Sequence, residues 1–394
     1  MTTAPHPASA AMARGPVVAM LSAAHPPEDV RVVGKEGAAL AAAGWQVLHI
    51  CPGESAPAES AGVALSPYAR RRGWRGRMLG LPALVRRARR SGAAVLHASE
   101  PDAWLAALLA ARGSGARVVL DVHEHYPSRL DHRLPRPLRP VARAAIRLAC
   151  RGMAARADAV VVAKDGLDQD FGPAARLLPV RNYAEALPLL PRIHAPGPVT
   201  LVHLGALTRS RGSHEMLDAL ALCPEGTRLS LVGRFTDGSE AAFLERMEAL
   251  ALGERVERHG WRARADALAL AAEADIGLVL FQPGIENHRL ALPHKLFDCM
   301  LAGLPVIAPA FATEVAEVVR EARCGLLVDA TSPSDIAAAV AELSDPAHRA
   351  LLGANGRAAA LGRFGWASEA ERLVGLYQEL APLPGPVPGR AGGH

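Results

Sequence analysis

Leu290-Ala-Leu-Pro-His-Lys-Leu-Phe-Asp-Cys-Met-Leu-Ala-Gly-Leu-Pro-Val-Ile-Ala308 is the stretch of sequence that decides the fold. Pro293 suits the first turn of a helix, because an amide at that position would have no partner within the helix. Gly303 followed by Pro305 marks the end of this helix, and the apolar residues 305–308 then predict a buried strand. The stretch therefore predicts a loop, a helix and a strand in succession.

The start of this predicted helix favours an anion. Its free amides point toward whatever precedes it, and the helix dipole adds to their attraction. Lys295 adds a full positive charge, and Asp298, one turn further on, could accept hydrogen bonds from sugar hydroxyls. We interpret the stretch as an element that binds a nucleotide-sugar.

The bulk composition suits two ordinary globular domains. The chain has 394 residues, of which 50% are hydrophobic and 21% are charged. A net charge of +5 is mild for this length, so a dedicated nucleic-acid-binding protein is not indicated. Residues 1–15 lack the apolar core of a signal peptide, and no apolar run reaches the length of a membrane span. We expect a cytoplasmic protein, and the sequence leaves its oligomeric state open.

Neither the cysteines nor the acidic residues predict a metal site. The five cysteines are scattered without metal-ligand spacing or a disulfide framework, and we expect reduced thiols at Cys51, Cys150, Cys223, Cys299 and Cys324. Asp168-Gln-Asp170 resembles an acidic triplet that holds a divalent metal, but it falls in a predicted helix without a neighbouring cluster. We therefore expect no metal and no cofactor.

Short apolar strands alternate with helices in the first half of the chain. The pattern predicts strands at residues 16–21, 45–50, 94–97, 117–121 and 159–163, and helices at residues 30–43, 104–111 and 138–155. This alternation is typical of a parallel sheet with helices on both faces.

A second alternation follows residues 183–198, whose four prolines predict a linker. It predicts strands at residues 199–204, 228–232, 256–259, 276–280, 305–308 and 324–328, with helices between them. The predicted fold class is α/β, with two Rossmann-like, doubly wound parallel-sheet domains that face an interdomain cleft. We place the domains at residues 16–185 and 199–363, with a linker at 186–198, and flexible tails at 1–15 and 382–394.

The last predicted helix carries several of the chain's few aromatic residues. Only 4% of the residues are aromatic, yet Phe364, Trp366 and Tyr377 lie within one short segment. We expect residues 364–381 to cross back and pack on the first domain.

Ligands of open α/β sheets bind beyond the carboxyl ends of the strands. In the second domain, Gly205 and Gly212 allow close approach of the backbone to a ligand, and Arg209 and Arg211 could bind two phosphoryl groups. Gly233 and Arg234 repeat this arrangement after the next strand. Two exposed loop arginines would be the commoner explanation of Arg209 and Arg211 taken alone.

The first domain offers polar residues at the same edge of its sheet. His123 follows a buried strand and could contact a sugar hydroxyl or a leaving group, although a single histidine at a strand end is more often structural. The loop after the first strand adds His25, Asp29 and Arg31.

Nine of the 21 residues from Arg70 to Arg90 are arginine. This segment could make a weak peripheral contact with anionic lipid at the inner face of a membrane. A solvated helix in an arginine-rich protein is the interpretation we favour, because the apolar face is short.

Several of these segments resemble glycosyltransferase family 4, whose members have the GT-B fold. Residues 292–307 are similar to the family pattern P-x-K-L-x-E-x-M-A-x-G-x-P-V-I, and Asp121-Val-His-Glu124 resembles its D-x-H-[DE] loop. Residues 204–212 resemble its phosphate-binding G-x-L-x-x-x-[KR]-G loop, and residues 29–36 resemble the start of its first helix. The resemblance extends from Pro16 to Leu380.

This resemblance implies a retaining, metal-independent transferase that moves a sugar from a nucleotide-sugar, with UDP favoured over GDP, to a glycan, lipid-linked or natural-product acceptor. It implies catalytic roles for His123, Arg211 and Lys295. It implies an acceptor near His25, Asp29, Arg31 and Glu124. It implies donor contacts from Gly205, Arg209, Gly212, Gly233, Arg234, Trp261, Arg262, Leu290, Ala291, Leu292, Leu296 and Asp298.

Two departures from the family pattern concern the sugar and the acceptor. The family often has two glutamates eight positions apart, where this chain has Leu290 and Asp298. Backbone amides at 290–292 could still bind sugar hydroxyls. The loop after the first strand also lacks the family's Gly-Gly pair. These departures leave two alternatives open, a nucleotide-sugar epimerase and a GT-B-like binding protein without catalysis.

Overall fold

The computed structural model describes residues 15–70, 73–173 and 176–384. Most of the two expected tails therefore lies outside the described residues. Leu383, which we assigned to the second tail, packs against the core of the first domain beside Gly44.

The first domain is built on a sheet with the strand order β3-β4-β2-β1-β5-β6-β7-β8, in which only the β3–β4 pair is antiparallel. The strands are β1 (Val17–Leu21), β2 (Gln46–Pro52), β3 (Glu59–Ser60), β4 (Val63–Tyr68), β5 (Val95–Ala98), β6 (Arg117–Val122), β7 (Ala159–Val162) and β8 (Leu177–Pro179). The helices are the π-helix η1 (Val32–Gly37), α1 (Ala38–Ala43), α2 (Gly73–Arg90), α3 (Pro101–Ala111) and α4 (Arg139–Ala154), with short 3-10 turns at Tyr126–Ser128, Asp131–Arg133, Arg136–Leu138 and Asp168–Asp170.

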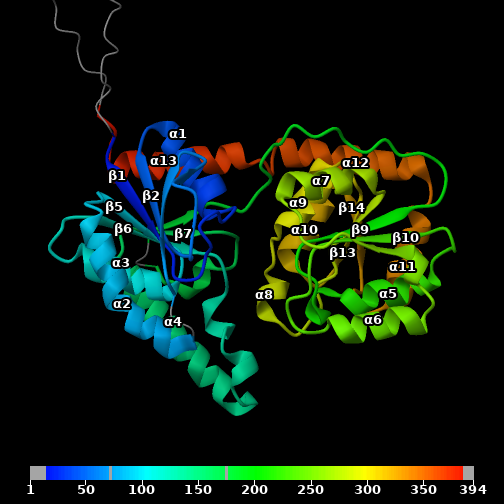
Figure 1. Ribbon diagram of the computed structural model, residues 1–394, viewed down its shortest axis with the longest axis horizontal. Helices are drawn as coiled ribbons and strands as arrows, with labels where there is room; N and C mark the ends of the chain where they lie inside the picture. Colours follow the sequence, from blue (N-terminus) through cyan, green and yellow to red (C-terminus); the bar gives the residue numbers. More distant parts are fainter. Residues whose placement is uncertain (1–14, 71–72, 174–175, 385–394) are drawn as a thin grey trace, which may run out of the picture.

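The second domain has an entirely parallel sheet with the order β11-β10-β9-β12-β13-β14. Its strands are β9 (Thr200–Leu204), β10 (Arg228–Val232), β11 (Val256–Arg258), β12 (Ile276–Leu278), β13 (Val306–Pro309) and β14 (Gly325–Val328). Its helices are α5 (Ser213–Leu222), α6 (Glu240–Ala249), α7 (Arg264–Glu273), α8 (Glu286–Arg289), α9 (His294–Leu301), α10 (Thr313–Ala322), α11 (Pro333–Glu342) and α12 (Pro346–Leu361), with 3-10 turns at Arg209–Arg211 and Gly253–Arg255. The prediction of two doubly wound parallel-sheet domains is confirmed, and Figure 1 shows them side by side.

The last helix, α13 (Trp366–Leu380), leaves the second domain and lies beside α1 of the first domain (Figure 1). Tyr377 is fully buried there and makes an edge-to-face contact with Trp45, at 6.0 Å between ring centroids. The indole N–H of Trp45 donates to the carbonyl of Ala381 at 2.9 Å. Residues from the two ends of the chain therefore complete one core.

The strand and helix predictions missed three strands and one helix: β3, β4, β8 and α8. β4 and β8 contain Pro67 and Pro179, and a proline argues against a strand unless the strand lies at an edge. β8 is an edge strand, and Pro67 lies beyond the two-residue pairing of β3 with β4. The exception for edge strands therefore applies to both prolines.

The helix predicted at residues 30–43 begins as a π-helix rather than an α-helix. Its wider turn directs Lys35 and Glu36 inward, where they are 1% and 0% exposed. A π-turn is rare and often marks a functional site. Here it brings charged side chains under the carboxyl edge of the first sheet.

Candidate functional site

Two glycines shape the loop between β9 and α5. Gly212 has φ of 79°, and a Cβ atom there would lie 2.4 Å from the carbonyl oxygen of Leu280. A Cβ atom on Gly233 would lie 1.7 Å from the carbonyl oxygen of Gly205. No larger residue fits Gly212 or Gly233 without a shift of the backbone, so the loop after β9 lies directly against the segments that follow β10 and β12.

Arg211 and Lys295 bring two positive charges to the space above this loop. Arg211 ends the 3-10 turn before α5, and Lys295 lies in the first turn of α9. Among the residues that the structure describes, neither is within ion-pair distance of a carboxylate. The ammonium group of Lys295 instead donates to Nε2 of His203 at 2.9 Å.

Burial makes both charges unfavourable, and no carboxylate of the described part of the chain offsets this cost. Burial lowers the pKa of Arg211. Burial, followed by the charge of Arg211, lowers the pKa of Lys295 well below its ordinary value. Burial and the charge of Lys295 lower the pKa of His203, so it is neutral and can accept a hydrogen bond. An anion placed beside Arg211 and Lys295 would therefore be strongly stabilised.

The remaining residues predicted at the phosphate loops lie toward the surface. Arg209 and Arg234 are exposed, and the amide of Arg209 donates to a carboxylate oxygen of Asp237 at 2.9 Å. Trp261 is 68% exposed and Arg262 is also exposed. Their predicted contacts with phosphate and base stay predictions.

Asp298 is already engaged with another side chain. Its Oδ1 accepts from the guanidinium of Arg264 at 3.1 Å, and Arg264 also donates to Glu185 at 2.7 Å. Burial raises the pKa of Asp298, although Arg264 opposes this shift. One carboxylate oxygen is left for the predicted contact with a ribose. Leu296 is fully buried in the core of the second domain, so its side chain does not reach a ligand.

Leu290 packs across the domain boundary into the hydrophobic core of the first domain. Its Cδ2 atom would lie 3.2 Å from a Cβ atom at Gly166, in the loop after β7. The amides of Leu290 and Ala291 donate to the carbonyls of Glu286 and His288 and close α8. Of the three amides predicted to bind the sugar, the described residues leave only that of Leu292 without a backbone acceptor.

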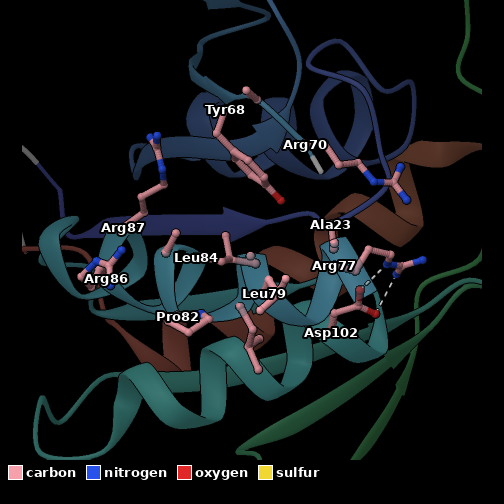
Figure 2. A pocket seen from close by; sticks show the side chains of 15 residues that line it. Ala23, Tyr68, Arg70, Arg77, Leu79, Pro82, Leu84, Arg86, Arg87 and Asp102 are labelled. Carbon is pink, nitrogen blue, oxygen red and sulfur yellow. Dashed lines mark hydrogen bonds and ion pairs between the residues drawn. The ribbon is translucent and has the colours of Figure 1, made fainter. Parts of the chain in front are cut away.

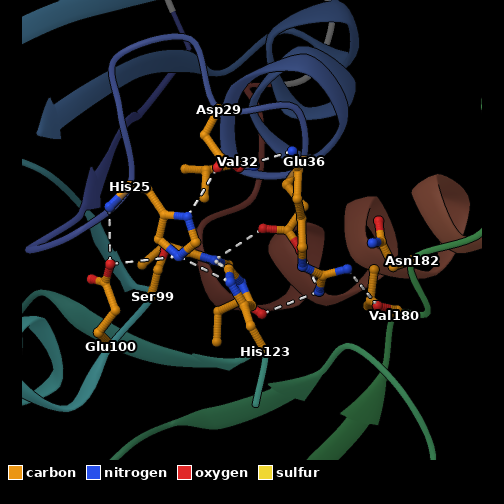
Figure 3. Close-up of polar contacts among 12 residues, drawn as sticks. His25, Asp29, Val32, Glu36, Ser99, Glu100, His123, Val180 and Asn182 are labelled. Carbon is orange, nitrogen blue, oxygen red and sulfur yellow. Dashed lines mark hydrogen bonds and ion pairs between the residues drawn. The ribbon is translucent and has the colours of Figure 1, made fainter. Parts of the chain in front are cut away.

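Two histidines of the first domain are in direct contact at the carboxyl edge of its sheet (Figure 3). Burial opposes a charge on His25, but its hydrogen bond to Asp29 at 3.0 Å and the charge of Asp29 raise its pKa to about 9. Charged His25 is a donor at both nitrogens, and its Nε2 donates to Nδ1 of His123 at 3.1 Å. His123 donates from Nε2 to the carboxylate of Asp121. Both ring nitrogens of His123 are therefore occupied.

A buried network extends from Asp121 to the last helix. Arg31 lies 2.6 Å from Glu36 and 3.1 Å from Asp121. His97 lies 3.3 Å from Glu36 and 3.4 Å from Asp121. Burial opposes a charge on His97, but the two carboxylates outweigh it and raise the pKa of His97 to about 9.

Glu36, His97 and Asp121 are close enough together to hold a metal ion. The guanidinium of Arg31 already places a positive charge between the two carboxylates. These residues therefore fit an internal ion-pair network without a metal. Metal-independent transfer stays a prediction. Asp170 of the acidic triplet accepts from Arg147 at 2.7 Å, which accounts for its burial.

Glu124 does not join this network. Its side chain is 50% exposed and lies 3.7 Å from Arg129. Its predicted contact with the acceptor stays a prediction, as do those of His25, Asp29 and Arg31. Arg31 is only 5% exposed and bound by two carboxylates, so it orders the site from within.

The loop of His25 is fixed by Glu100, a residue that the sequence analysis did not single out. The carboxylate of Glu100 accepts from the amides of Ala23, Ala24 and His25 at 2.8, 2.9 and 3.1 Å. Glu100 and His97 lie at the end of β5, so the rule used for His123, that polar residues at strand ends gather at one edge, would have found them.

Beside this loop, a hollow of about 330 Å³ opens between the end of β4 and α2 (Figure 2). A second hollow, of about 380 Å³, lies between the domains and is lined by Asp165 and Arg181 of the first and by Leu292 and Glu314 of the second. Burial, Asp165 and Glu317 raise the pKa of Glu314 to about 7.

Direct polar contacts also join the two domains. The amide of His125 donates to Asn287 at 2.8 Å, and Asn182 donates to His294 at 2.9 Å. Lys35 lies 3.4 Å from His294 and 2.6 Å from the carbonyl of Tyr183. Residue 294 begins α9, so the first domain contacts the helix that carries Lys295.

Among the described residues, no helix combines the length and the apolar character that a membrane span requires. α2 places its apolar residues Leu84 and Ala88 in the core, while Arg86, Arg87, Arg89 and Arg90 are exposed. The contact of residues 70–90 with a membrane stays a prediction.

Comparisons with known proteins agree with this architecture. A model of Glycosyltransferase Family 4 matches residues 30–170, and a model of Glycosyl transferases group 1 matches residues 198–345. A search among curated proteins finds no match.

Similar solved structures span nearly the whole chain. Sucrose-phosphate synthase from Thermosynechococcus elongatus has a TM-score of 0.75 and 19% identity over 93% of this chain and 99% of that one. Anabaena HepE in complex with UDP has a TM-score of 0.70 and 17% identity over 92% and 99% of the two chains. HepE in complex with UDP-glucose has a TM-score of 0.69 and 18% identity over 92% and 100%. With both of its domains matched by glycosyltransferase models, the chain is a glycosyltransferase of the GT-B fold that resembles family 4.

Proposed function

We propose that this protein transfers a sugar from a UDP-sugar to a hydroxyl-bearing acceptor, with retention at the anomeric carbon and without a metal ion. The observation that carries the proposal is the pair Arg211 and Lys295, two buried or half-buried cations without a carboxylate partner among the described residues. The UDP and UDP-glucose complexes of the similar HepE support the choice of donor.

The arrangement favours the transition state over the ground state. As the bond between the sugar and the diphosphate breaks, negative charge grows on the leaving oxygen. Arg211, Lys295 and the free amides at the start of α9 are already in place, so their attraction increases with that charge without reorganisation. Removal of one such donor typically costs about a factor of 10²–10³ in turnover.

The first domain would hold the acceptor near the paired histidines. Because both ring nitrogens of His123 are occupied, we assign His123 a role in shaping the site around the transferred sugar rather than in removing the acceptor proton. The location of the protein, in the cytoplasm or at the inner face of a membrane, stays a prediction and depends on the nature of the acceptor.

The test is release of nucleotide by the full chain from a panel of UDP-, GDP- and dTDP-sugars, with and without EDTA. We expect release of UDP, unaffected by EDTA. The variants Arg211→Gln and Lys295→Gln should each lose at least tenfold in UDP affinity or turnover. Arg112→Gln removes an exposed charge at the end of α3 and serves as the matched control.

Other outcomes identify the alternatives. Conversion of one nucleotide-sugar into another would indicate an epimerase, and binding without turnover would indicate a binding protein. Faster release of GDP would overturn the choice of donor, and loss of activity in EDTA would overturn transfer without a metal.

A further inference from the structure

The hollow beside α2 adjoins the loop after β1, the loop that also carries His25 (Figure 2). It is lined by the end of β4, by residues of α2, by Ala23 in the loop after β1 and by Asp102 at the start of α3. Its volume of about 330 Å³ lies within the range of small-molecule sites, roughly 300–1,000 Å³.

One part of this lining is apolar. Leu79, Pro82 and Leu84 of α2 face the ring of Tyr68 across the hollow. The hydroxyl of Tyr68 donates to the carbonyl of Ser22 at 2.8 Å, which fixes the ring as a wall. Apolar walls of this kind bind a hydrocarbon or an aromatic body and offer little to a free glycan, whose hydroxyls need polar partners.

The other part of the lining is positively charged. Four arginines, Arg70, Arg77, Arg86 and Arg87, line the hollow together with a single carboxylate, that of Asp102. Two nitrogens of the Arg77 guanidinium, Nε and Nη2, donate to the carboxylate of Asp102. The distance from Nη2 to Oδ1 is 2.7 Å. The charge of Arg70 is not paired with any carboxylate of the described residues, and it lies at the end of the hollow nearer Ala23 and Arg77 in Figure 2.

The same loop joins the hollow to the histidine pair. Ala23 lines the hollow, and its amide and that of His25 are both held by Glu100. Asp102 follows Glu100 by two residues on the same segment. A molecule in the hollow would therefore have one end against the loop that carries His25, and His25 contacts His123.

We propose that the acceptor of this transferase is an apolar molecule with an anionic group, a phosphate or a carboxylate. Its apolar body lies between Tyr68 and α2, and Arg70 and the neighbouring arginines bind its anion. This inference rests on the proposed function, since it names the acceptor class of the same site. It does not depend on the donor residues, which lie in the other domain.

An apolar molecule with an anionic group could reach this hollow from either of two sources. A lipid phosphate would be presented by a membrane, and Met78 of α2, which does not line the hollow, is 54% exposed. A dissolved apolar acid would enter from solution without a membrane. The probes below separate them.

Binding is measured by calorimetry on the full chain, below the concentration at which the probes form micelles. The probes are octyl phosphate, octanol and inorganic phosphate. We expect octyl phosphate to bind at least tenfold more tightly than either octanol or inorganic phosphate. If octanol bound as tightly as octyl phosphate, the arginines would not contribute to binding. If inorganic phosphate bound as tightly as octyl phosphate, the apolar wall would not contribute.

Three variants locate the site. Leu79→Ser and Arg70→Gln change exposed side chains, and each should weaken octyl phosphate binding at least threefold. Arg112→Gln removes the same charge elsewhere on the domain and should leave binding unchanged. An equal effect of all three variants, or no effect of the first two, would overturn the proposal.

UDP binding and UDP release are measured on the same samples, so the two proposals can fail separately. If the wild type binds octyl phosphate but releases no UDP from UDP-sugars, the proposed transferase function is contradicted and the proposed binding site is not. Sedimentation with phosphatidylglycerol vesicles, reversed by octyl phosphate, would identify a membrane source. Octyl phosphate binding without sedimentation would identify a dissolved source, and both results agree with the proposed chemistry.

Discussion

The hydroxyl oxygen of Tyr377 lies 2.7 Å from Nδ1 of His97, although the two residues are 280 positions apart in the chain. His97 is also within 3.4 Å of Asp121, whose carboxylate binds His123. The last helix therefore reaches the candidate site through two buried side chains. Burial, together with Glu36 and Asp121, raises the pKa of Tyr377 well above its ordinary value, so its hydroxyl is neutral.

We expect Tyr377→Phe to lower both stability and turnover. The ring keeps its packing against Trp45, but the buried Nδ1–H of His97 loses its partner, at a cost of about 1–3 kcal/mol. His97 can then turn away from Asp121, and turnover should fall several-fold. Urea denaturation and UDP release measure the two effects.

Tyr183→Phe is the matched control for this prediction, because Tyr183 makes aromatic contacts with Phe297 and Phe364 rather than with the network. The UDP affinity of Tyr377→Phe should stay at the wild-type value, since the residues proposed to bind the donor lie in the other domain. A fall in stability with unchanged turnover would show that Tyr377 only supports the fold.

Gly212→Ala should disrupt the proposed phosphate-binding loop. The backbone at Gly212 has φ of 79°, and an added Cβ atom would meet the carbonyl of Leu280 at 2.4 Å. We expect a loss of about 1–3 kcal/mol in stability from strain of this kind, and a larger loss of UDP affinity than of octyl phosphate affinity. Calorimetry with the two ligands measures the difference.

Gly375→Ala provides the control, because Gly375 is in α13 and a Cβ atom there would meet nothing within 4 Å. Alanine in the helix should stabilise the protein by about 0.5–1 kcal/mol. Normal UDP binding by Gly212→Ala would mean that the loop adapts and does not cradle phosphate.

Leu290→Ala should weaken the contact between the domains. Leu290 is 5% exposed and belongs to the core of the first domain, although the chain places it in the second. Its truncation should cost about 2–3 kcal/mol, at the lower end for a buried leucine because an interface can close the gap. Urea denaturation measures the loss, and X-ray scattering should show a larger radius of gyration.

The control is Leu351→Ala, since Leu351 is 59% exposed on α12 and should change stability by less than about 0.5 kcal/mol. An unchanged radius of gyration and a wild-type free energy of unfolding in Leu290→Ala would show that position 290 does not hold the domains together.

The pKa of His25 should be about 9 in the folded protein, compared with its ordinary value of 6.5. The folded state thus binds this proton more tightly than the unfolded state. The resulting stabilisation is complete below about pH 6.5 and is lost as the pH rises through 9. Once deprotonated, His25 has no proton on the nitrogen that faces Nδ1 of His123, and we expect the pair to open and turnover to fall.

Asp29→Asn tests the cause of this shift. The asparagine oxygen can still accept from the amides of Arg31 and Val32, but the negative charge beside His25 is gone. The pKa of His25 should fall toward 6.5, and the alkaline fall in turnover should move to lower pH by the same amount. A histidine titration followed by NMR measures the pKa, with His25→Asn to assign the resonance. A pKa that stays near 9 in Asp29→Asn would contradict this account.

Much of the fold could be predicted from the sequence. Strands β9, β10 and β13 and helices α5 and α9 were found within two residues, because their apolar runs end at glycine or proline. The π-helix η1 was not found, since apolar spacing does not distinguish it from an α-helix. The turn between β9 and α5 could be predicted for a similar reason. Gly205 and Gly212 mark the positions where the backbone turns beyond the limits of other residues.

The candidate site was predicted less completely. The sequence pointed to Lys295, Arg211 and His123, each at a strand end or a helix start. The rule for strand ends extends to Glu100 and His97 as well, but nothing in the sequence connects His97 with Tyr377, whose role depends on what lies opposite it in space.

The stretch from Leu290 to Ala308 shows where the division lies. The sequence by itself determined the helix that carries Lys295 and Asp298, because proline, glycine and apolar spacing act on neighbouring residues. Only the tertiary structure decided that Leu290 packs into the other domain, that Asp298 is bound by Arg264, and that Lys295 and Arg211 lack a carboxylate among the described residues. Local preferences act through a few adjacent bonds, whereas burial and charge depend on partners that the folded chain brings from a distance.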